Sequence, residues 1–225
     1  MSELFDLEDH AAAEYAAAGF VVFPSCLLTA AAELASRDKR RPALGCVHVF
    51  TDGRRVVAES TDSYAAARIV YDGDAEQPAL DMLMRAEHVR AMKLQDGRSN
   101  YVAVTETGDA VEVHMLKHSP ASDTFNAGGS TPARVPVPFI GYPLVSRLFS
   151  ELEALEASPA PVWFNPARMA SVMKAARRVD KDAGVCMYSF KPRRRNGAAE
   201  PVEMILNATG SRVMFKAALM PCIPR

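Results

Sequence analysis

Apolar residues recur along the chain in short segments whose spacing alternates between strand-like and helix-like. Residues 20–23 form an apolar run that predicts a buried strand, and residues 27–38 place apolar side chains at helical spacing. A hairpin is predicted around Asp52-Gly53, because this pair supplies the positive φ of a tight turn. Residues 64–71 predict a third strand. The first unit is therefore strand, helix and three strands.

The same order of elements then begins twice more. The second unit is predicted as a strand over 79–84, a helix over 86–94 and strands over 101–104 and 111–115. The third is predicted as a strand at 162–164, a helix over 166–179 and strands near 185–190, 202–207 and 212–219. Between them, residues 121–138 predict a loop and residues 144–157 a helix. This internal repeat predicts an α+β fold of βαβββ units, with antiparallel sheets and helices on one face.

Composition is that of a globular protein, with 225 residues, 49% of them hydrophobic and 24% charged. The net charge is −1, so any nucleic-acid binding has to come from a local basic surface. Acidic residues near the N-terminus and the lack of an apolar run of about 18 residues predict a cytoplasmic protein without a membrane partner. Four cysteines without a CxxC pair predict buried thiols, and we expect no metal and no cofactor.

Three separated segments have a recognisable order. They are Arg41 to Val47 together with Thr61 to Tyr64, then Tyr142 to Leu148, and finally Ala218 to Cys222. These segments resemble motifs of the bacterial DNA polymerase III beta subunit, the sliding clamp, which read roughly RPxLxGV…ATDGxRLA, FPDYRRxxP and YxxMPxRL.

The resemblance covers most of the chain and implies a clamp-like fold. Residues 20–150 resemble the middle clamp domain, and residues 160–223 resemble the second half of the last one. We therefore expect a clamp-like domain over 1–150 and a partial clamp-like domain over 151–225. No segment resembles the first clamp domain, and Ser63 to Ala66 lack the arginine and leucine of the family motif. The chain resembles a shortened member of the family.

The resemblance implies a non-enzymatic processivity factor. Its subunits would form a homo-oligomer around double-stranded DNA, without sequence preference, and tether a DNA polymerase or other proteins with clamp-binding peptides. The alternative is a clamp-derived interaction module that does not encircle DNA. An enzyme on an unrelated α+β fold stays open as a third class, although the five histidines are scattered and no GxSxG, HExxH or phosphate-binding glycine loop occurs.

Two sets of candidate site residues follow from the resemblance and from the charge pattern. The expected peptide-binding residues are Thr61, Tyr64, Pro143, Arg147, Leu148, Ala218, Met220 and Pro221. The alternative is that these residues only pack one sheet onto the next. The expected DNA-binding residues are Arg37, Lys39, Arg40, Arg85, Arg90, Lys93, Lys174, Arg177, Arg178 and Lys181. The alternative is a set of solvated helix faces. No catalytic residue is expected.

Overall fold

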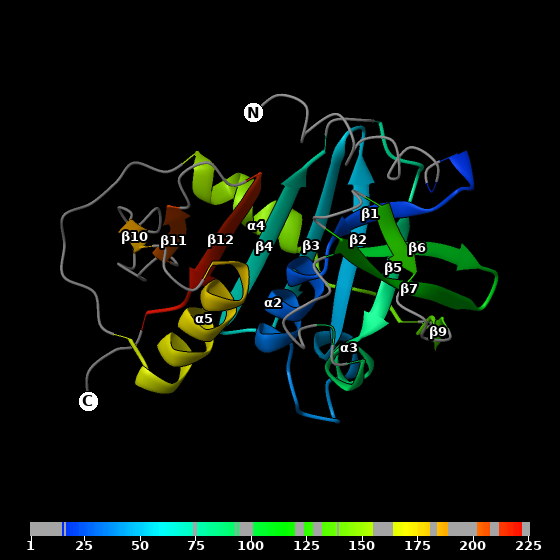
Figure 1. Cartoon of the computed structure of the whole chain (residues 1–225). Coiled ribbons are helices and arrows are strands. Elements are labelled where there is room, and N and C mark those ends of the chain that lie inside the picture. Colours follow the sequence, from blue (N-terminus) through cyan, green and yellow to red (C-terminus); the bar gives the residue numbers. More distant parts are fainter. Residues whose placement is uncertain are drawn as a thin grey trace, which may run out of the picture.

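Two antiparallel sheets form the framework of the protein, and the larger one joins residues from both halves of the chain (Figure 1). The computed structural model describes residues 15, 17–73, 76–92, 94, 101–119, 124–127, 132–138, 140–154, 164–180, 184–188, 202–207 and 212–221. The larger sheet has seven strands, in the spatial order β10 (Gly184–Tyr188), β11 (Val202–Asn207), β12 (Val213–Leu219), β4 (Ala65–Asp72), β3 (Arg55–Thr61), β2 (Cys46–Asp52) and β5 (Asp81–Arg85).

The smaller sheet is linked to the larger one because the first two units exchange their first strands. Its strands are β1 (Val21–Pro24), β6 (Tyr101–Thr107), β7 (Ala110–Ser119) and β8 (Thr124–Ala127), with β9 (Ala133–Pro136) paired with β7. The first strand of each unit pairs with the other unit: β1 pairs with β6, and β5 pairs with β2. The first two predicted strand, helix and hairpin units are thus confirmed, and neither of them is a separate sheet.

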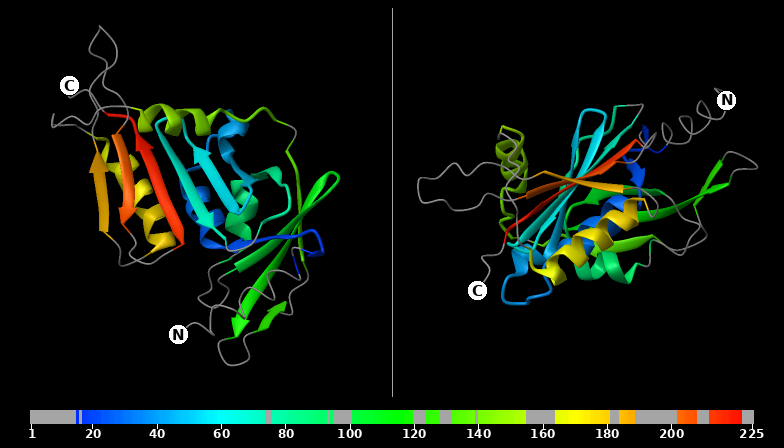
Figure 2. Two further views of the ribbon diagram at one scale, coloured as in Figure 1. Left: turned by 90° about the horizontal axis from the view of Figure 1, so that it is seen from above. Right: turned by 90° about the vertical axis from the view of Figure 1, so that its left-hand side faces the viewer.

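The helices divide between the two faces of the large sheet (Figure 2). On one face lie α2 (Cys26–Leu34), α3 (Ala86–Ala91) and α5 (Pro166–Val179); α4 (Val145–Glu153) lies on the other. Helix α5 begins where the sequence predicts, because the Asn165 side chain accepts hydrogen bonds from the Ala167 and Arg168 amides and Pro166 occupies the first turn. A 3-10 turn, η1 (Pro42–Gly45), precedes β2.

Side-chain alternation along the strands explains this layering. In β3, Val56 and Ala58 belong to the main core under the helices, and Phe215 of β12 belongs to the same core. Glu59 and Lys216 alternate with them and contact residues of α4, on the other face. The core is continuous across residue 150, so the division into 1–150 and 151–225 stays a prediction.

Some predicted boundaries differ from the structure. Helix α2 ends at Leu34 and not at 38, so the basic residues that follow lie in a loop. The chain turns there because the Ser36 amide donates to the Leu44 carbonyl. The predicted loop over 121–138 contains β8 and β9, two short strands on one edge of β7, where Pro136 is tolerated. The predicted strand at 162–164 lies almost entirely outside the described residues.

No helix in the described part of the chain is both long and apolar enough to span a membrane. Within the same residues, no group of three or more His, Cys, Asp or Glu side chains is placed to hold a metal ion.

Candidate functional site

The three segments that suggested a site converge where β4 meets β12. These strands pair antiparallel from Val213 opposite Tyr71 to Leu219 opposite Ala65. Just beyond the last pair, the Met220 amide donates a 2.8 Å hydrogen bond to the Tyr64 carbonyl. Two predicted peptide-binding residues, distant in sequence, are therefore direct neighbours.

Helix α4 completes this region from the outer face of the sheet. Leu148 packs against a small buried cluster that includes Phe149, Ala66 and Ala218. Tyr64 and Met220, which share a backbone hydrogen bond, are 53% and 42% exposed. We call Tyr64, Leu148, Ala218 and Met220 the junction surface. Ala218 is buried, as the packing interpretation expects, whereas Tyr64 and Met220 are exposed, as a binding surface requires.

A strained turn presents Tyr64. Ser63 has φ of +76°, which is the left-handed region that favours glycine. The Asp62 carboxylate accepts hydrogen bonds from the Tyr64 and Ala65 amides, both at 2.9 Å. Thr61 Oγ1 accepts from the Ser63 amide and donates to the Ala65 carbonyl. These bonds hold the turn in its strained conformation, so Tyr64 has a fixed position.

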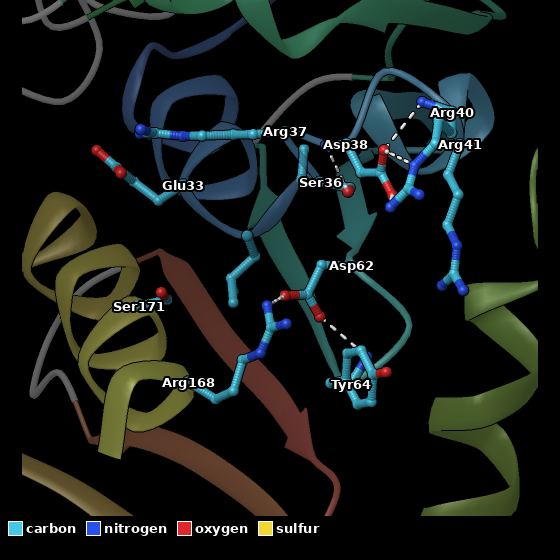
Figure 3. A pocket seen from close by; sticks show the side chains of 12 residues that line it. Glu33, Ser36, Arg37, Asp38, Arg40, Arg41, Asp62, Tyr64, Arg168 and Ser171 are labelled. Atoms are coloured by element: carbon cyan, nitrogen blue, oxygen red, sulfur yellow. Dashed lines mark hydrogen bonds and ion pairs between the residues drawn. The ribbon is translucent and has the colours of Figure 1, made fainter. Parts of the chain in front are cut away.

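Two arginines flank this turn (Figure 3). Arg168, in the first turn of α5, forms an ion pair with Asp62, and its guanidinium lies 4.8 Å from the centre of the Tyr64 ring. Arg41 donates a 3.0 Å hydrogen bond to the Ser63 hydroxyl. Neither arginine was among the predicted site residues. Arg41 lies in the first motif and could have been included, whereas Arg168 reaches Tyr64 only through the β4–β12 pairing.

The remaining predicted peptide-binding residues have mixed positions. Thr61 is 8% exposed and its hydroxyl is used within the turn, so it supports Tyr64 more than it lines a surface. Arg147 is exposed and forms a 2.8 Å ion pair with Glu151, one helical turn later. Pro143 and Pro221 are half-buried beside the junction. None of these positions tests ligand binding, and the assignment of the whole set stays a prediction.

A row of charged side chains fixes α4 to the outer face. The cross-strand register places His48, Glu59, Arg68 and Lys216 side by side on four neighbouring strands. Glu59 is 1% exposed and pairs with Arg68 at 2.7 Å, while the Ser146 hydroxyl donates to it from α4 at 2.9 Å. Arg68 also lies over the Phe149 ring at 5.1 Å.

Electrostatics within this row favour its charged forms. Burial raises the pKa of Glu59, but the ion pair with His48 at 3.9 Å and hydrogen bonds from Arg68 and Ser146 outweigh it, so the pKa lies below its usual value. Burial lowers the pKa of His48, but the ion pair with Glu59 at 3.9 Å and the 2.7 Å hydrogen bond to Asp81 outweigh it, so that pKa is raised. Burial raises the pKa of Tyr142, whose ring packs against His48.

The predicted DNA-binding residues separate into groups. Four of them line one cavity of about 490 Å³ beside the loop after α2, namely Arg37, Lys39, Arg85 and Arg90. On α5, Lys174 and Arg178 both form ion pairs with Glu33 of α2, at 2.8 and 3.1 Å, and Arg177 is exposed. Arg40 pairs with Asp38. Lys93 and Lys181 lie outside the described residues.

Arg90 has a structural role that the sequence did not indicate. Its guanidinium donates hydrogen bonds to the carbonyls of Ala32 and Ala35, at the end of α2. These carbonyls have no partner within the helix, so the cation caps the C-terminus of α2 from α3. Arg90 is thus engaged by the backbone of α2, which makes it poorly available to a ligand.

Comparison with known proteins identifies the fold. No protein-family model matches the sequence, and no curated protein matches it. Among solved structures, the DNA polymerase III beta subunit of Thermotoga maritima is similar, with a TM-score of 0.59 at 12% identity over 91% of this chain and 66% of that one. The DNA polymerase III beta chain of Streptococcus pneumoniae TIGR4 gives 0.54 at 12% identity over 91% of this chain and 65% of that one.

The chain therefore spans about 65% of the length of these clamp subunits. At such low identity, the similarity concerns the backbone arrangement and not the side chains. The predicted α+β fold of clamp type is confirmed: this chain is structurally similar to the beta subunit of DNA polymerase III, the sliding clamp.

Proposed function

We propose that this protein is a non-catalytic, clamp-type tethering protein. In this proposal the junction surface binds a short peptide of a DNA polymerase or another DNA-processing partner. The face of the large sheet that carries α2, α3 and α5 contacts double-stranded DNA in a homo-oligomer, without reading its sequence. Tethering then raises the local concentration of the partner. The observation that supports it most is the convergence of three separated segments at the β4–β12 junction, with Tyr64 and Met220 exposed there.

The junction surface has the chemistry of a peptide site. An exposed tyrosine on a strained, fully hydrogen-bonded turn supplies a rigid aromatic face. Met220 supplies a flexible apolar side chain that adapts to different partners. Because a short peptide pays an ordering cost on binding, we expect a dissociation constant on the order of micromolar.

Peptide binding can be tested by charge insertion at Met220. A fluorescently labelled peptide with a Leu-Phe end should bind the wild type, and Met220→Glu should abolish binding in fluorescence anisotropy. The matched control is Met214→Glu, because Met214 is 48% exposed near the opposite end of β12. Binding that survives Met220→Glu, or is lost equally in Met214→Glu, would count against the junction surface.

A specific observation favours a second function, an interaction module that does not encircle DNA. Glu33 neutralises Lys174 and Arg178, two cations of the predicted DNA-binding face. Burial raises the pKa of Glu33, but hydrogen bonds from these two side chains outweigh it, so the carboxylate stays ionised at neutral pH. Any duplex binding by α5 then works against a fixed negative charge.

Glu33 therefore separates the two functions. If α5 contacts DNA, Glu33→Gln should strengthen duplex binding, and the double variant Lys174→Glu, Arg178→Glu should weaken it uniformly across sequences. The salt slope should change by about one for each DNA phosphate that the variant newly neutralises or no longer neutralises. Titrations of linear and circular duplex at several salt concentrations measure this. A wild type and a Glu33→Gln variant that both lack salt-dependent binding would favour the module, and light scattering would then show whether a closed oligomer forms.

A further inference from the structure

A cavity of about 450 Å³ lies beside Tyr64, next to the junction surface (Figure 3). It is bordered by the loop after α2, the turn between β3 and β4, and the first half of α5. Its polar lining includes Arg40, Arg41 and Arg168 together with Asp38 and Asp62. Because Tyr64 belongs to both, the cavity and the junction surface form one continuous region.

The charges in this cavity are unequally satisfied. Arg40 makes two contacts with Asp38, at 3.0 and 3.1 Å, and Arg168 is paired with Asp62. Arg41 instead donates to the neutral hydroxyl of Ser63, at 3.0 Å. Its guanidinium extends toward the Tyr64 side of the cavity, whereas Arg37 points away from Tyr64 (Figure 3). The Arg41 guanidinium thus has a neutral hydrogen-bond partner next to the proposed peptide site, and, besides the hydrogen bonds from Arg40, its charge also helps to lower the pKa of the Asp38 carboxyl.

The geometry points to an acidic subsite for the peptide that binds the junction surface. We propose that the partner peptide has a glutamate, aspartate or phosphorylated residue beside its apolar anchors, and that Arg41 binds this group with Arg168 next to it. This inference rests on the proposed function. A guanidinium binds a carboxylate or phosphate through two parallel hydrogen bonds, and the bond to Ser63 already orients Arg41.

The mixed charge of the lining favours a peptide over a nucleic-acid backbone. Asp38 and Asp62 would repel successive phosphates of a DNA strand. A peptide places its acidic group at one point only, and its amides can donate to the same aspartates. The concave shape and the shared Tyr64 also suit a peptide that continues from the junction surface.

The test compares two labelled peptides that differ only in one Glu or Gln beside the Leu-Phe anchors, with the position moved across both flanks. At low salt the wild type should bind the best Glu peptide about 3- to 10-fold more tightly than its Gln counterpart, since the new bond is charge-assisted but solvent-accessible. Arg41→Gln should remove this preference, so that the Glu and Gln peptides bind the variant equally. Arg54→Gln is the matched control and should keep the preference, because Arg54 is an exposed arginine just before β3, at the end of that strand away from Thr61.

The outcomes separate this inference from the function on which it rests. Equal binding of Glu and Gln peptides by the wild type overturns the acidic subsite while the peptide site stands. Loss of all peptide binding overturns the proposed function first. If Arg41→Gln instead lowers duplex affinity and reduces the salt slope by about one, with peptide preference unchanged, the cavity is a phosphate contact and the subsite is overturned. Thermal unfolding of Arg41→Gln should match the wild type, because the side chain is exposed.

Discussion

The two faces of the seven-stranded sheet are stabilised by different kinds of interaction. Under α2 and α5 the strands present apolar side chains such as Val56, Ala58 and Phe215 to one continuous core. On the opposite face, α4 lies over a row of charged groups centred on Glu59. Hydrophobic burial is non-directional, whereas hydrogen-bonded ion pairs require one geometry. The face under α2 and α5 therefore supplies stability, whereas the outer face specifies where α4 and the junction surface lie.

The largest expected effect comes from the apolar face. Phe215→Ala should lower the free energy of unfolding by about 3–5 kcal/mol, because it removes a fully buried ring and leaves a cavity. Met214→Ala, next to it but 48% exposed, should cost less than about 1 kcal/mol. Urea denaturation of both variants measures the difference. Equal losses would show that the two faces do not differ as described.

A smaller effect is expected on the charged face. Glu59→Gln keeps an acceptor for Ser146 but leaves Arg68 without its counter-charge, so we expect a loss of about 1–3 kcal/mol. The matched control is Glu153→Gln, which breaks a pair between a half-exposed carboxylate and Lys216 and should cost about 0–1 kcal/mol. Glu59→Gln should also weaken peptide binding, since Ser146 and Leu148 share α4. A Glu59→Gln variant as stable as Glu153→Gln would contradict the role of the row.

The smallest effect is a pH dependence from His48. Its folded pKa is raised above the usual 6.5, so its stabilising contribution is complete below that value and is lost as pH rises through the folded pKa. The urea midpoint of the wild type should fall as pH rises through the folded pKa of His48, and His48→Gln should remove this decrease. Measurements from about pH 6 to 9 cover the window.

Glu59 has the opposite sign. Its folded pKa is below the usual 4.5, so its contribution is present above that value and is lost as pH falls through the folded pKa. Acid titration of Glu59→Gln should therefore show a shallower loss of stability than the wild type. If the loss of stability at low pH is the same in Glu59→Gln and the wild type, other carboxylates dominate that loss.

Local patterns predicted the elements well. The helix over 166–179 matches α5 from end to end, because Asn165 and Pro166 mark its start and apolar spacing marks its face. The predicted end of α2 at residue 38 was wrong because residues 35–38 do not by themselves end a helix. The helix stops there through contacts with distant residues, namely the Leu44 carbonyl and the Arg90 side chain. Such contacts leave no local signal.

The candidate site was predictable only in part. Motif order brought Tyr64, Leu148, Ala218 and Met220 to attention, and the structure places them in one region. The row under α4 was missed, although Glu59 and Arg68 are charged residues inside strands that are largely apolar around them. A buried charge needs a partner, so this pattern was a usable signal once the hairpin register was known. Arg168 was beyond reach, because its place beside Tyr64 depends on the pairing of β4 with β12.

The β4–β12 pairing also has a consequence for biosynthesis. Strand β12 leaves the ribosome about 140 residues after β4, its partner in the sheet. At 5–20 residues per second, the interval is on the order of ten seconds. During that time one edge of β4 has unsatisfied backbone groups, and the core side of β4 lacks α5 and Phe215. A nascent chain of this protein therefore passes through a prolonged state with an open sheet edge, and a holding chaperone should improve its yield at high expression rates.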